Sequence, residues 1–258
     1  KKSKPNYIIN FSAQSMVGES WSNPLDWFQT NTIGLIRLYN FIFHNIKLKR
    51  LIHISTPEVY GSVKNRIVEN KNYKPNSPYA ASRVSADQYL EILNKNFGFD
   101  YCSIRASNVF GETQKLYRII PKTIYSILKN KKIYLHGGGY SKRNFIHMEN
   151  VSKAILKCLY DGKAGEIYHV SGDKTLSIRD LVKKICKIMN YDFNKLVMPS
   201  EERKGKDQEY SLSNNKIKKY FKWKEKVSLD EGLIRTIKWL KINLNYFNIN
   251  DESYRHKK

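Results

Sequence analysis

The chain has 258 residues, of which 41% are hydrophobic and 13% aromatic, so it can bury a core and does not have the composition of a disordered chain. Its formal net charge of +23 comes mainly from lysines spread along the whole length. This charge is typical of a solvated surface and also suits an anionic ligand such as a diphosphate. Three distant cysteines argue against a disulfide framework, and no run of about 18 apolar residues predicts a membrane span, which together favour the cytoplasm.

The first half of the chain predicts strands that alternate with helices. Residues 7–11 predict a strand, residues 33–45 predict a helix by their apolar spacing, and Leu51–Ile54 predict a second, buried strand. Polar residues follow that strand at once, in Ser55-Thr56-Pro57-Glu58-Val59-Tyr60-Gly61. Ligands bind at the carboxyl ends of parallel strands, so these hydroxyls and this carboxylate are candidate site residues.

A second polar cluster begins at Asn76-Ser77-Pro78-Tyr79, which predicts a helix start with a capping side chain and a proline in the first turn. Tyr79 and Arg83 are four residues apart, so both side chains leave the same face of this helix. A neighbouring positive charge stabilises phenolate, which makes a tyrosine easier to ionise. Tyr79 is therefore a candidate general base.

These two clusters resemble the active site of the extended short-chain dehydrogenase/reductases that act on nucleotide sugars, and most closely their hexose 4,6-dehydratases. Those enzymes have a strand that ends in Ser-Thr-Asp-Glu-Val-Tyr-Gly and a Tyr-x-x-x-Lys helix opened by Ser-Pro. The resemblance implies an α/β fold, with a Rossmann-type doubly wound parallel sheet and a smaller α/β substrate-binding domain. It also implies NAD as cofactor, a nucleotide-sugar substrate and a homodimer, with no nucleic acid or membrane as partner.

The resemblance also implies the domain boundaries. Residues 1–111 and 143–172 would form a partial NAD-binding Rossmann domain, and residues 112–142 and 173–258 a nucleotide-sugar-binding domain. The N-terminal glycine-loop unit of the family has no counterpart here, and Gly137-Gly138-Gly139 is interpreted as a turn because a helix does not follow it. We therefore expect the chain to be part of a longer protein.

The family's reaction assigns roles to particular residues. Tyr79 would take the proton of the sugar's C4 hydroxyl during its oxidation, Thr56 would bond the C4 oxygen, and Glu58 would remove the C5 proton before water leaves from C6. The residues that the resemblance places in catalysis are Thr56, Glu58, Tyr79 and Arg83. Those that it places at the cofactor are Ala13, Ser15, Asn31, Ser55, Tyr79 and Arg83. Those that it places at the substrate are Asn108, Arg118, Arg143 and Arg203.

Some of these assignments have simpler alternatives. Asn108 can cap a turn, Arg143 can form a surface ion pair, and His147 and His169, which have no metal-type neighbours in sequence, are expected to be packed or surface histidines. Two positions also depart from the family pattern. Pro57 stands where many relatives have an aspartic acid that donates a proton, and Arg83 stands where the family has lysine. Arginine keeps the charge but not the shape, so we expect reduced turnover rather than none.

The rest of the chain predicts further alternation. Strands are predicted at 99–105 and 166–172, a helix after Pro121 as far as about residue 130, and a helix over 175–189 capped by Thr175 or Ser177. A nucleotide-sugar decarboxylase or epimerase of the same superfamily is an alternative function, although epimerases usually lack the glutamate. A truncated, inactive remnant is another, and nucleic-acid binding has no supporting motif.

Overall fold

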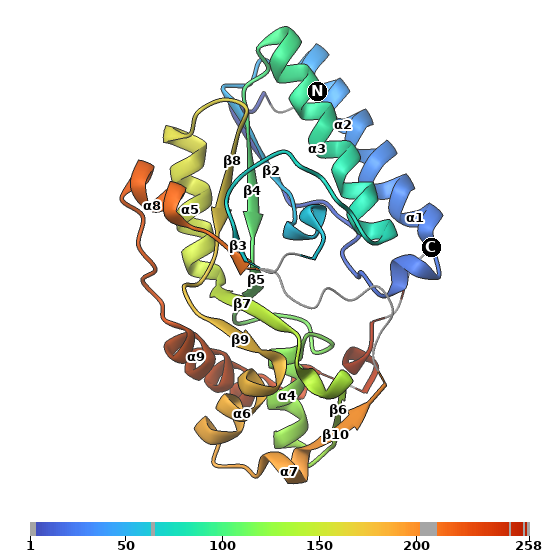
Figure 1. Cartoon of the computed structure of the whole chain (residues 1–258), viewed down its shortest axis with the longest axis vertical. Coiled ribbons are helices and arrows are strands. Elements are labelled where there is room, and N and C mark those ends of the chain that lie inside the picture. Colours follow the sequence, from blue (N-terminus) through green and yellow to red (C-terminus); the bar gives the residue numbers. More distant parts are fainter. Residues whose placement is uncertain (1–3, 63–64, 202–210, 248, 255, 257–258) are drawn as a thin grey trace.

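The structure is a computed structural model that describes residues 4–62, 65–201, 211–247, 249–254 and 256. Figure 1 shows a larger lobe built on a parallel sheet and a smaller lobe below it. The sheet consists of β1 (Tyr7–Asn10), β2 (Arg50–Ile54), β4 (Tyr101–Ala106) and β8 (Glu166–Val170), in that spatial order and all parallel. All four strands therefore end at the same edge of the sheet, which faces the smaller lobe.

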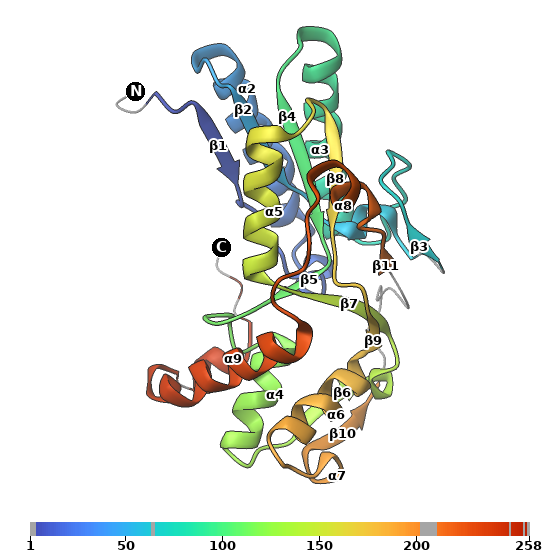
Figure 2. The same cartoon turned by 90° about the vertical axis from the view of Figure 1, so that its left-hand side faces the viewer.

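Helices cover both faces of this sheet (Figure 2). On one face lie α1 (Pro24–Phe28), the wide π-helical turn η2 (Gln29–Gly34), α2 (Leu35–Asn45) and α3 (Pro78–Phe97), and α5 (Met148–Asp161) lies on the other. Successive side chains of a strand point to opposite faces, so each strand contributes to two cores.

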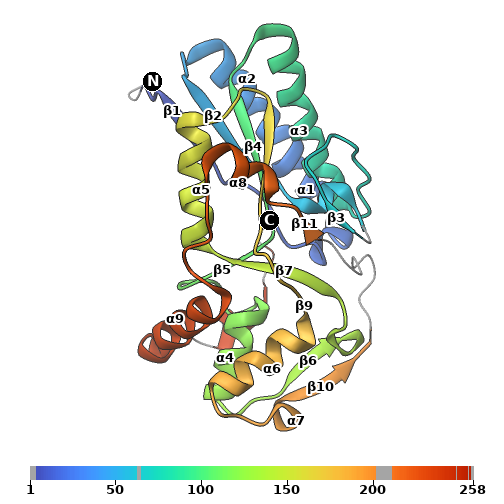
Figure 3. The ribbon, with the colours of Figure 1, turned by 60° about the vertical axis from the view of Figure 1, so that its left-hand side comes forward.

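The two cores can be followed from one strand. Leu51 packs with Tyr39 of α2 and Leu90 of α3, whereas the next residue, Ile52, packs with Ile155 of α5. Helix α8 (Asn215–Phe221) also belongs to this second core, through the buried Ile217, and Figure 3 shows it beside β8. A sheet with helices on both faces explains why β1, β2 and β8 carry consecutive apolar residues rather than an alternating pattern.

The smaller lobe has its own core, made of residues after Phe110. Its sheets are small: β5 (Asn108–Phe110), β7 (Lys142–His147) and β9 (Thr175–Ser177) form one, and β6 (Ile133–His136) with β10 (Val197–Ser200) another. Its helices are α4 (Ile119–Leu128), α6 (Ile178–Ile188), α7 (Phe193–Leu196) and α9 (Leu229–Ile242). A third short pair, β3 (Arg66–Ile67) with β11 (Ser211–Leu212), lies beside the larger lobe.

The remaining short elements are single 3₁₀ turns: η1 (Glu19–Trp21), η3 (Pro57–Tyr60), η4 (Gly137–Gly139), η5 (Leu244–Tyr246) and η6 (Ile249–Glu252). The turn predicted at Gly137–Gly139 is confirmed, because all three glycines have positive φ angles of 54°, 65° and 78°. None of the described helices is both long and apolar enough to span a membrane.

The fold class and most predicted elements are confirmed, and the strands differ from their predicted bounds by one or two residues. Three differences at the starts of helices have a physical reason. Helical structure begins at Pro24 rather than near Ile33, because the π-helical turn widens the helix and interrupts its apolar spacing. Helix α4 begins at Ile119, before Pro121. Proline is tolerated there because the N–H groups of the first helical turn make no hydrogen bond within the helix, so none is lost. Residues 175–177 are strand β9, so Ser177 rather than Thr175 caps α6, and its side chain accepts a hydrogen bond from Asp180 N at 3.0 Å.

Candidate active site

A cavity of about 460 Å³ lies at the carboxyl ends of β2 and β4, between the larger lobe and α4. Seven of the predicted site residues line it: Ser15, Ser55, Thr56, Glu58, Tyr79, Asn108 and Arg118. The two clusters recognised in the sequence thus meet at one place, as expected for side chains at the same edge of a parallel sheet.

Thr56 and Glu58 are positioned by the turn that follows β2. Thr56 is the N-cap of η3, where its Oγ1 accepts a hydrogen bond from Glu58 N at 3.4 Å and donates one to the Glu58 carboxylate. Pro57 occupies the first position of η3 and is buried, so it stiffens the turn and presents no titratable group. The hydroxyl and the carboxylate are therefore held side by side on the cavity wall.

Tyr79 is positioned by the start of α3. The cap of this helix is Ser77, which accepts a hydrogen bond from Ala80 N at 3.2 Å, and Tyr79 follows within the first turn, 7% exposed. Burial and the nearby Glu58 raise the pKa of Tyr79. Arg83 acts in the opposite direction, as the sequence predicted, but burial and Glu58 outweigh it. Arg83 therefore lowers the pKa of Tyr79, as expected from the sequence. The expectation that Tyr79 is easy to ionise is nevertheless wrong, because its pKa as a whole is raised.

The guanidinium of Arg83 is only 1% exposed and is not part of the cavity wall. Its Nη1 donates to the carbonyl oxygen of Ser12 at 3.3 Å, and its Nη2 donates to the carbonyl oxygen of Ile54. These bonds join the loop after β1 to the last residue of β2. Arg83 thus ties two strand ends together and acts on Tyr79 by its charge alone.

Asn31 is fully buried and uses its whole side chain within the protein. Its Oδ1 accepts from Gln14 N at 2.8 Å, and its Nδ2 donates to Gln14 O at 3.0 Å and to Ser82 Oγ at 3.1 Å. Asn31 therefore fixes the loop that carries the exposed Ala13 and the cavity residue Ser15, rather than facing the cavity itself.

The predicted substrate residues are distributed less evenly. Arg118, the N-cap residue of α4, donates from Nη2 to Ser15 Oγ at 3.2 Å, and Asn108 donates to Asn144 O at 3.4 Å; both line the cavity. Arg143 is 9% exposed, donates to Lys142 O at 2.7 Å and does not line the cavity. Arg203 lies outside the described residues.

A buried polar cluster beneath the cavity was not predicted from the sequence. Asp87 of α3 accepts hydrogen bonds from His53 Nε2 at 2.8 Å, Ser55 Oγ at 2.8 Å and Arg105 Nη2 at 2.7 Å. Against the effect of burial, Arg105 and His53 hold the pKa of Asp87 well below its usual range. Asp87 follows Arg83 by one helical turn, and that spacing was the available signal.

The histidine of this cluster is neutral. Burial lowers the pKa of His53 despite its contact with Asp87. We therefore assign the ring proton to Nε2, which donates to Asp87, and Nδ1 accepts a hydrogen bond from the Tyr39 hydroxyl, 2.5 Å away. His147 and His169 are also buried, 2% and 0% exposed, which confirms that they are packed histidines. The described residues contain no group of three or more histidine, cysteine or acidic side chains arranged for a metal ion.

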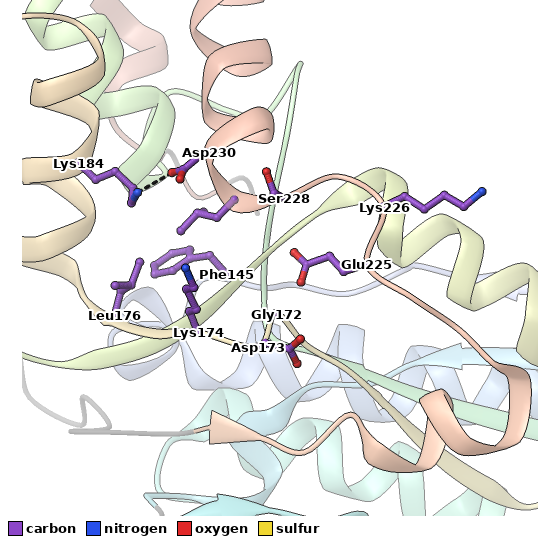
Figure 4. Close-up of a pocket in the computed structure, with 11 residues that line it drawn as sticks. Phe145, Gly172, Asp173, Lys174, Leu176, Lys184, Glu225, Lys226, Ser228 and Asp230 are labelled. Atoms are coloured by element: carbon purple, nitrogen blue, oxygen red, sulfur yellow. Dashed lines mark hydrogen bonds and ion pairs between the residues drawn. The ribbon is translucent and has the colours of Figure 1, made fainter.

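A second cavity, of about 480 Å³, shares only Phe145 with the lining of this one (Figure 4). Asp173, Lys174, Glu225 and Asp230 surround it, and Lys184 bridges to Asp230 at 2.5 Å. No residue that the sequence predicted for the site lines it, so the cavity at β2 and α3 is the candidate active site.

The parallel sheet and the Thr56, Glu58 and Tyr79 cluster define an extended short-chain dehydrogenase/reductase that resembles the nucleoside-diphosphate-hexose 4,6-dehydratases. The chain belongs to the GDP-mannose 4,6-dehydratase family, whose sequence model matches residues 1–236. Among curated relatives, dTDP-D-glucose 4,6-dehydratase of Dictyostelium discoideum is 29% identical over an alignment of 302 residues. The alignment covers 99% of this chain and 69% of that protein. A trifunctional UDP-glucose 4,6-dehydratase of Arabidopsis thaliana is 30% identical over 236 residues.

Solved structures show the same fold. The dTDP-glucose 4,6-dehydratase DesIV of Streptomyces venezuelae, solved with NAD bound, superposes with a TM-score of 0.88 at 31% identity and covers 94% of this chain and 75% of that one. A UDP-glucose 4-epimerase of Thermotoga maritima superposes with a TM-score of 0.86 at 28% identity, covering 93% and 78%. The chain spans about a third of the length of the trifunctional plant relative, 35%.

Proposed function

We propose that this chain carries the catalytic and substrate-binding part of an NAD-dependent nucleotide-sugar 4,6-dehydratase, a hydro-lyase. The observation that carries the proposal is the meeting of Thr56, Glu58 and Tyr79 on one cavity wall, with Asn108 and Arg118 opposite. A hydroxyl, a carboxylate and a phenol at one cavity are the groups that proton removal at two neighbouring sugar carbons requires.

The residues around Tyr79 fit the nicotinamide end of NAD. Ser15 and Tyr79 present hydroxyl groups to the same cavity, and Ala13 lies exposed on the loop that leads to Ser15. Ser55 also lines the cavity, although its hydroxyl donates to Asp87. When bound, NAD supplies the hydride acceptor for oxidation at C4 of the sugar. Arg83 and Asn31 support this wall from behind, through the loop after β1.

The protein's own groups then move the protons. Tyr79 takes the proton of the C4 hydroxyl, whose oxygen also receives a hydrogen bond from Thr56. The C4 ketone acidifies C5, and Glu58 removes the C5 proton. Because Pro57 has no proton to give, Glu58 also protonates the C6 hydroxyl, which leaves as water. C6 would then take back the hydride removed from C4, C5 would take up a proton from solvent, and Tyr79 would give the proton from the C4 hydroxyl back to solvent. The product is a 4-keto-6-deoxy sugar, still attached to its nucleotide.

Arg118 and Arg143, both predicted at the substrate, differ in their position relative to the cavity. Arg118 donates to Ser15 at the cavity and in this proposal binds the diphosphate, for which its planar fork is suited. Asn108 is the second diphosphate contact. Arg143 and Arg203 stay predicted contacts, and Arg143 would have to reach the diphosphate from outside the cavity lining.

The assembly and compartment are also proposals. Helix α2 exposes Leu38 and Phe41, which are 38% and 49% exposed, beside α3, and we propose that this face pairs with a second copy in a homodimer. Light scattering after gel filtration would show twice the 30.3 kDa mass of the chain. Three free, buried cysteines are compatible with the reducing cytoplasm.

The test is proton NMR in heavy water with NAD and, in turn, dTDP-glucose, GDP-mannose, UDP-N-acetylglucosamine and UDP-glucuronate. A new C6 methyl signal, with deuterium gained at C5, is the expected result and names the substrate. Loss of the glucuronate carboxylate would indicate a decarboxylase instead. Inversion at C4 would indicate an epimerase, a second candidate supported by the similarity to the Thermotoga maritima UDP-glucose 4-epimerase. No change with any sugar would favour the inactive remnant, provided that the protein under test is folded.

A further inference from the structure

The C-terminal end of the chain crosses from the smaller lobe to the larger one. After α9, Glu252 at the end of η6 forms an ion pair with Lys131, just beyond α4, at 2.5 Å. Four residues later His256 reaches the larger lobe, where its Nε2 lies 2.6 Å from Asp26 of α1. Figure 1 shows the chain running upward from the smaller lobe toward α1. A few residues therefore join the two lobes directly.

The contacts of this segment are made by residues two apart. Glu252, Tyr254 and His256 are the residues of this segment that make these contacts. The ring of Tyr254 lies edge-on to that of Tyr117, 5.5 Å between centroids, and the ring of His256 lies 5.0 Å from that of Trp27. We call these three residues the strap.

The strap contacts both walls of the candidate active site. On the substrate side, Tyr117 lines the cavity together with Arg118, whose guanidinium lies over the Tyr117 ring at 5.6 Å. On the cofactor side, His256 Nδ1 lies 3.2 Å from Gln14 Nε2, and Gln14 precedes the cavity residue Ser15. Arg118 and Ser15 are themselves hydrogen-bonded across the mouth. The strap thus runs beside the Arg118–Ser15 bond that closes this mouth.

We propose that the strap fixes the separation of the two walls and thereby positions Arg118 for the diphosphate of a nucleotide. Tyr254 and His256 are positioning residues, because they act through Tyr117, Gln14 and Asp26 and do not line the cavity. The inference rests on the proposed function, which supplies the nucleotide ligand. The strap lies within residues 237–258, which the family model does not match.

The first test is isothermal titration of the whole chain with dTDP and with UDP. His256→Ala removes the contacts to Asp26, Gln14 and Trp27. We expect it to weaken nucleotide affinity about tenfold, because one good polar contact contributes about that much to binding. Tyr246→Ala is the matched control, because Tyr246 belongs to the same end of the chain, is 83% exposed and should leave the affinity unchanged. Unchanged or tighter binding by His256→Ala would overturn the proposal.

The second test does not depend on a nucleotide. Trp27 is fully buried and its ring packs against that of His256, so removal of the imidazole should expose the indole and increase the quenching of its fluorescence by iodide. The other three tryptophans are unchanged in the variant. If the unmodified chain binds neither nucleotide, the proposed function has failed and iodide quenching still decides the strap. Equal quenching of the unmodified chain and of folded His256→Ala would then reject it.

Discussion

Two polar clusters share β2 and α3 and differ in what surrounds them. Asp87, His53 and Arg105 are 3%, 0% and 0% exposed, and they pair with one another at 2.7–2.8 Å. Glu58 and Tyr79 instead line a cavity together with Thr56. The same sheet edge thus holds a closed cluster that fixes the fold and an open cluster that faces a ligand. The comparison predicts that mutations in the first change stability and those in the second change turnover.

The largest expected effect separates these clusters from the side of catalysis. Glu58→Gln keeps the size of the side chain but removes the base for C5, so turnover should fall about a thousandfold, within the usual range for a general acid or base. The free energy of unfolding should change little, because Glu58 is not part of the buried cluster. Rate measurements with the substrate that NMR identifies, beside a urea titration, check both halves. Loss of stability without loss of turnover would contradict the assignment.

The buried cluster should give the reverse result. Asp87→Asn leaves the Arg105 guanidinium without its anion in a site that water does not reach, and the free energy of unfolding should fall by about 3 kcal/mol. Urea denaturation measures this loss. Asp26→Asn, which changes a carboxylate 42% exposed on α1, is the matched control and should cost much less. Equal costs would mean that burial is not what distinguishes the clusters.

The pH dependence of stability extends the comparison to His169, which touches the buried cluster through Tyr60 at 2.8 Å. Burial, aided by Arg105, lowers the pKa of His169 to about 3. The unfolded chain therefore binds a proton that the folded chain rejects between about pH 6.5 and pH 3, and stability falls as the pH drops through this range.

The His169 contribution should be about 2 kcal/mol at pH 5 relative to neutral pH. His169→Gln cannot take up the proton, so its unfolding free energy should decline less between pH 7 and pH 5 than that of the unmodified chain. Parallel declines in the two proteins would show that other groups cause the acid sensitivity.

The smallest expected effect concerns Arg83. Its Nη1 and Nη2 donate to the carbonyl oxygens of Ser12 and Ile54, and it influences Tyr79 only by charge. Lysine has a compact charge that can approach Tyr79 and the cofactor-side wall more closely, so Arg83→Lys should raise turnover about fivefold. Steady-state rates at saturating substrate measure the change, and a variant that is no faster would argue against this reading of Arg83.

The sequence predicted what depends on local chemistry. A strand followed at once by Thr56 and Glu58, and a helix capped by Ser77 ahead of Tyr79, are both in the structure as expected. They were recognisable because a cap and the residues it serves lie within a few positions of each other. Because α3 is the crossover helix between the parallel strands β2 and β4, its first turn lies at the carboxyl end of β2.

The sequence did not show where long side chains would find partners. Arg83 reaches a carbonyl 71 residues away and Asn31 a loop 17 residues away, so both point behind the wall and not into the cavity. The Asp87 cluster joins residues from β2, α3 and β4, and only the folded sheet makes them neighbours. Tyr117 and Phe145 were missed for a related reason, since an aromatic residue gives no sign in sequence of whether it faces a core or a cavity.

Strand β1 has a practical consequence for handling the protein. Among the described strands it is bonded only to β2, so one row of its backbone N–H and C=O groups faces outward, beside Ile9 and Phe11, which are 36% and 55% exposed. An apolar, unpaired strand edge is a template for β-sheet association between molecules. Concentrated samples of this chain should therefore aggregate through β1, and a soluble partner polypeptide that supplies one more parallel strand would protect them.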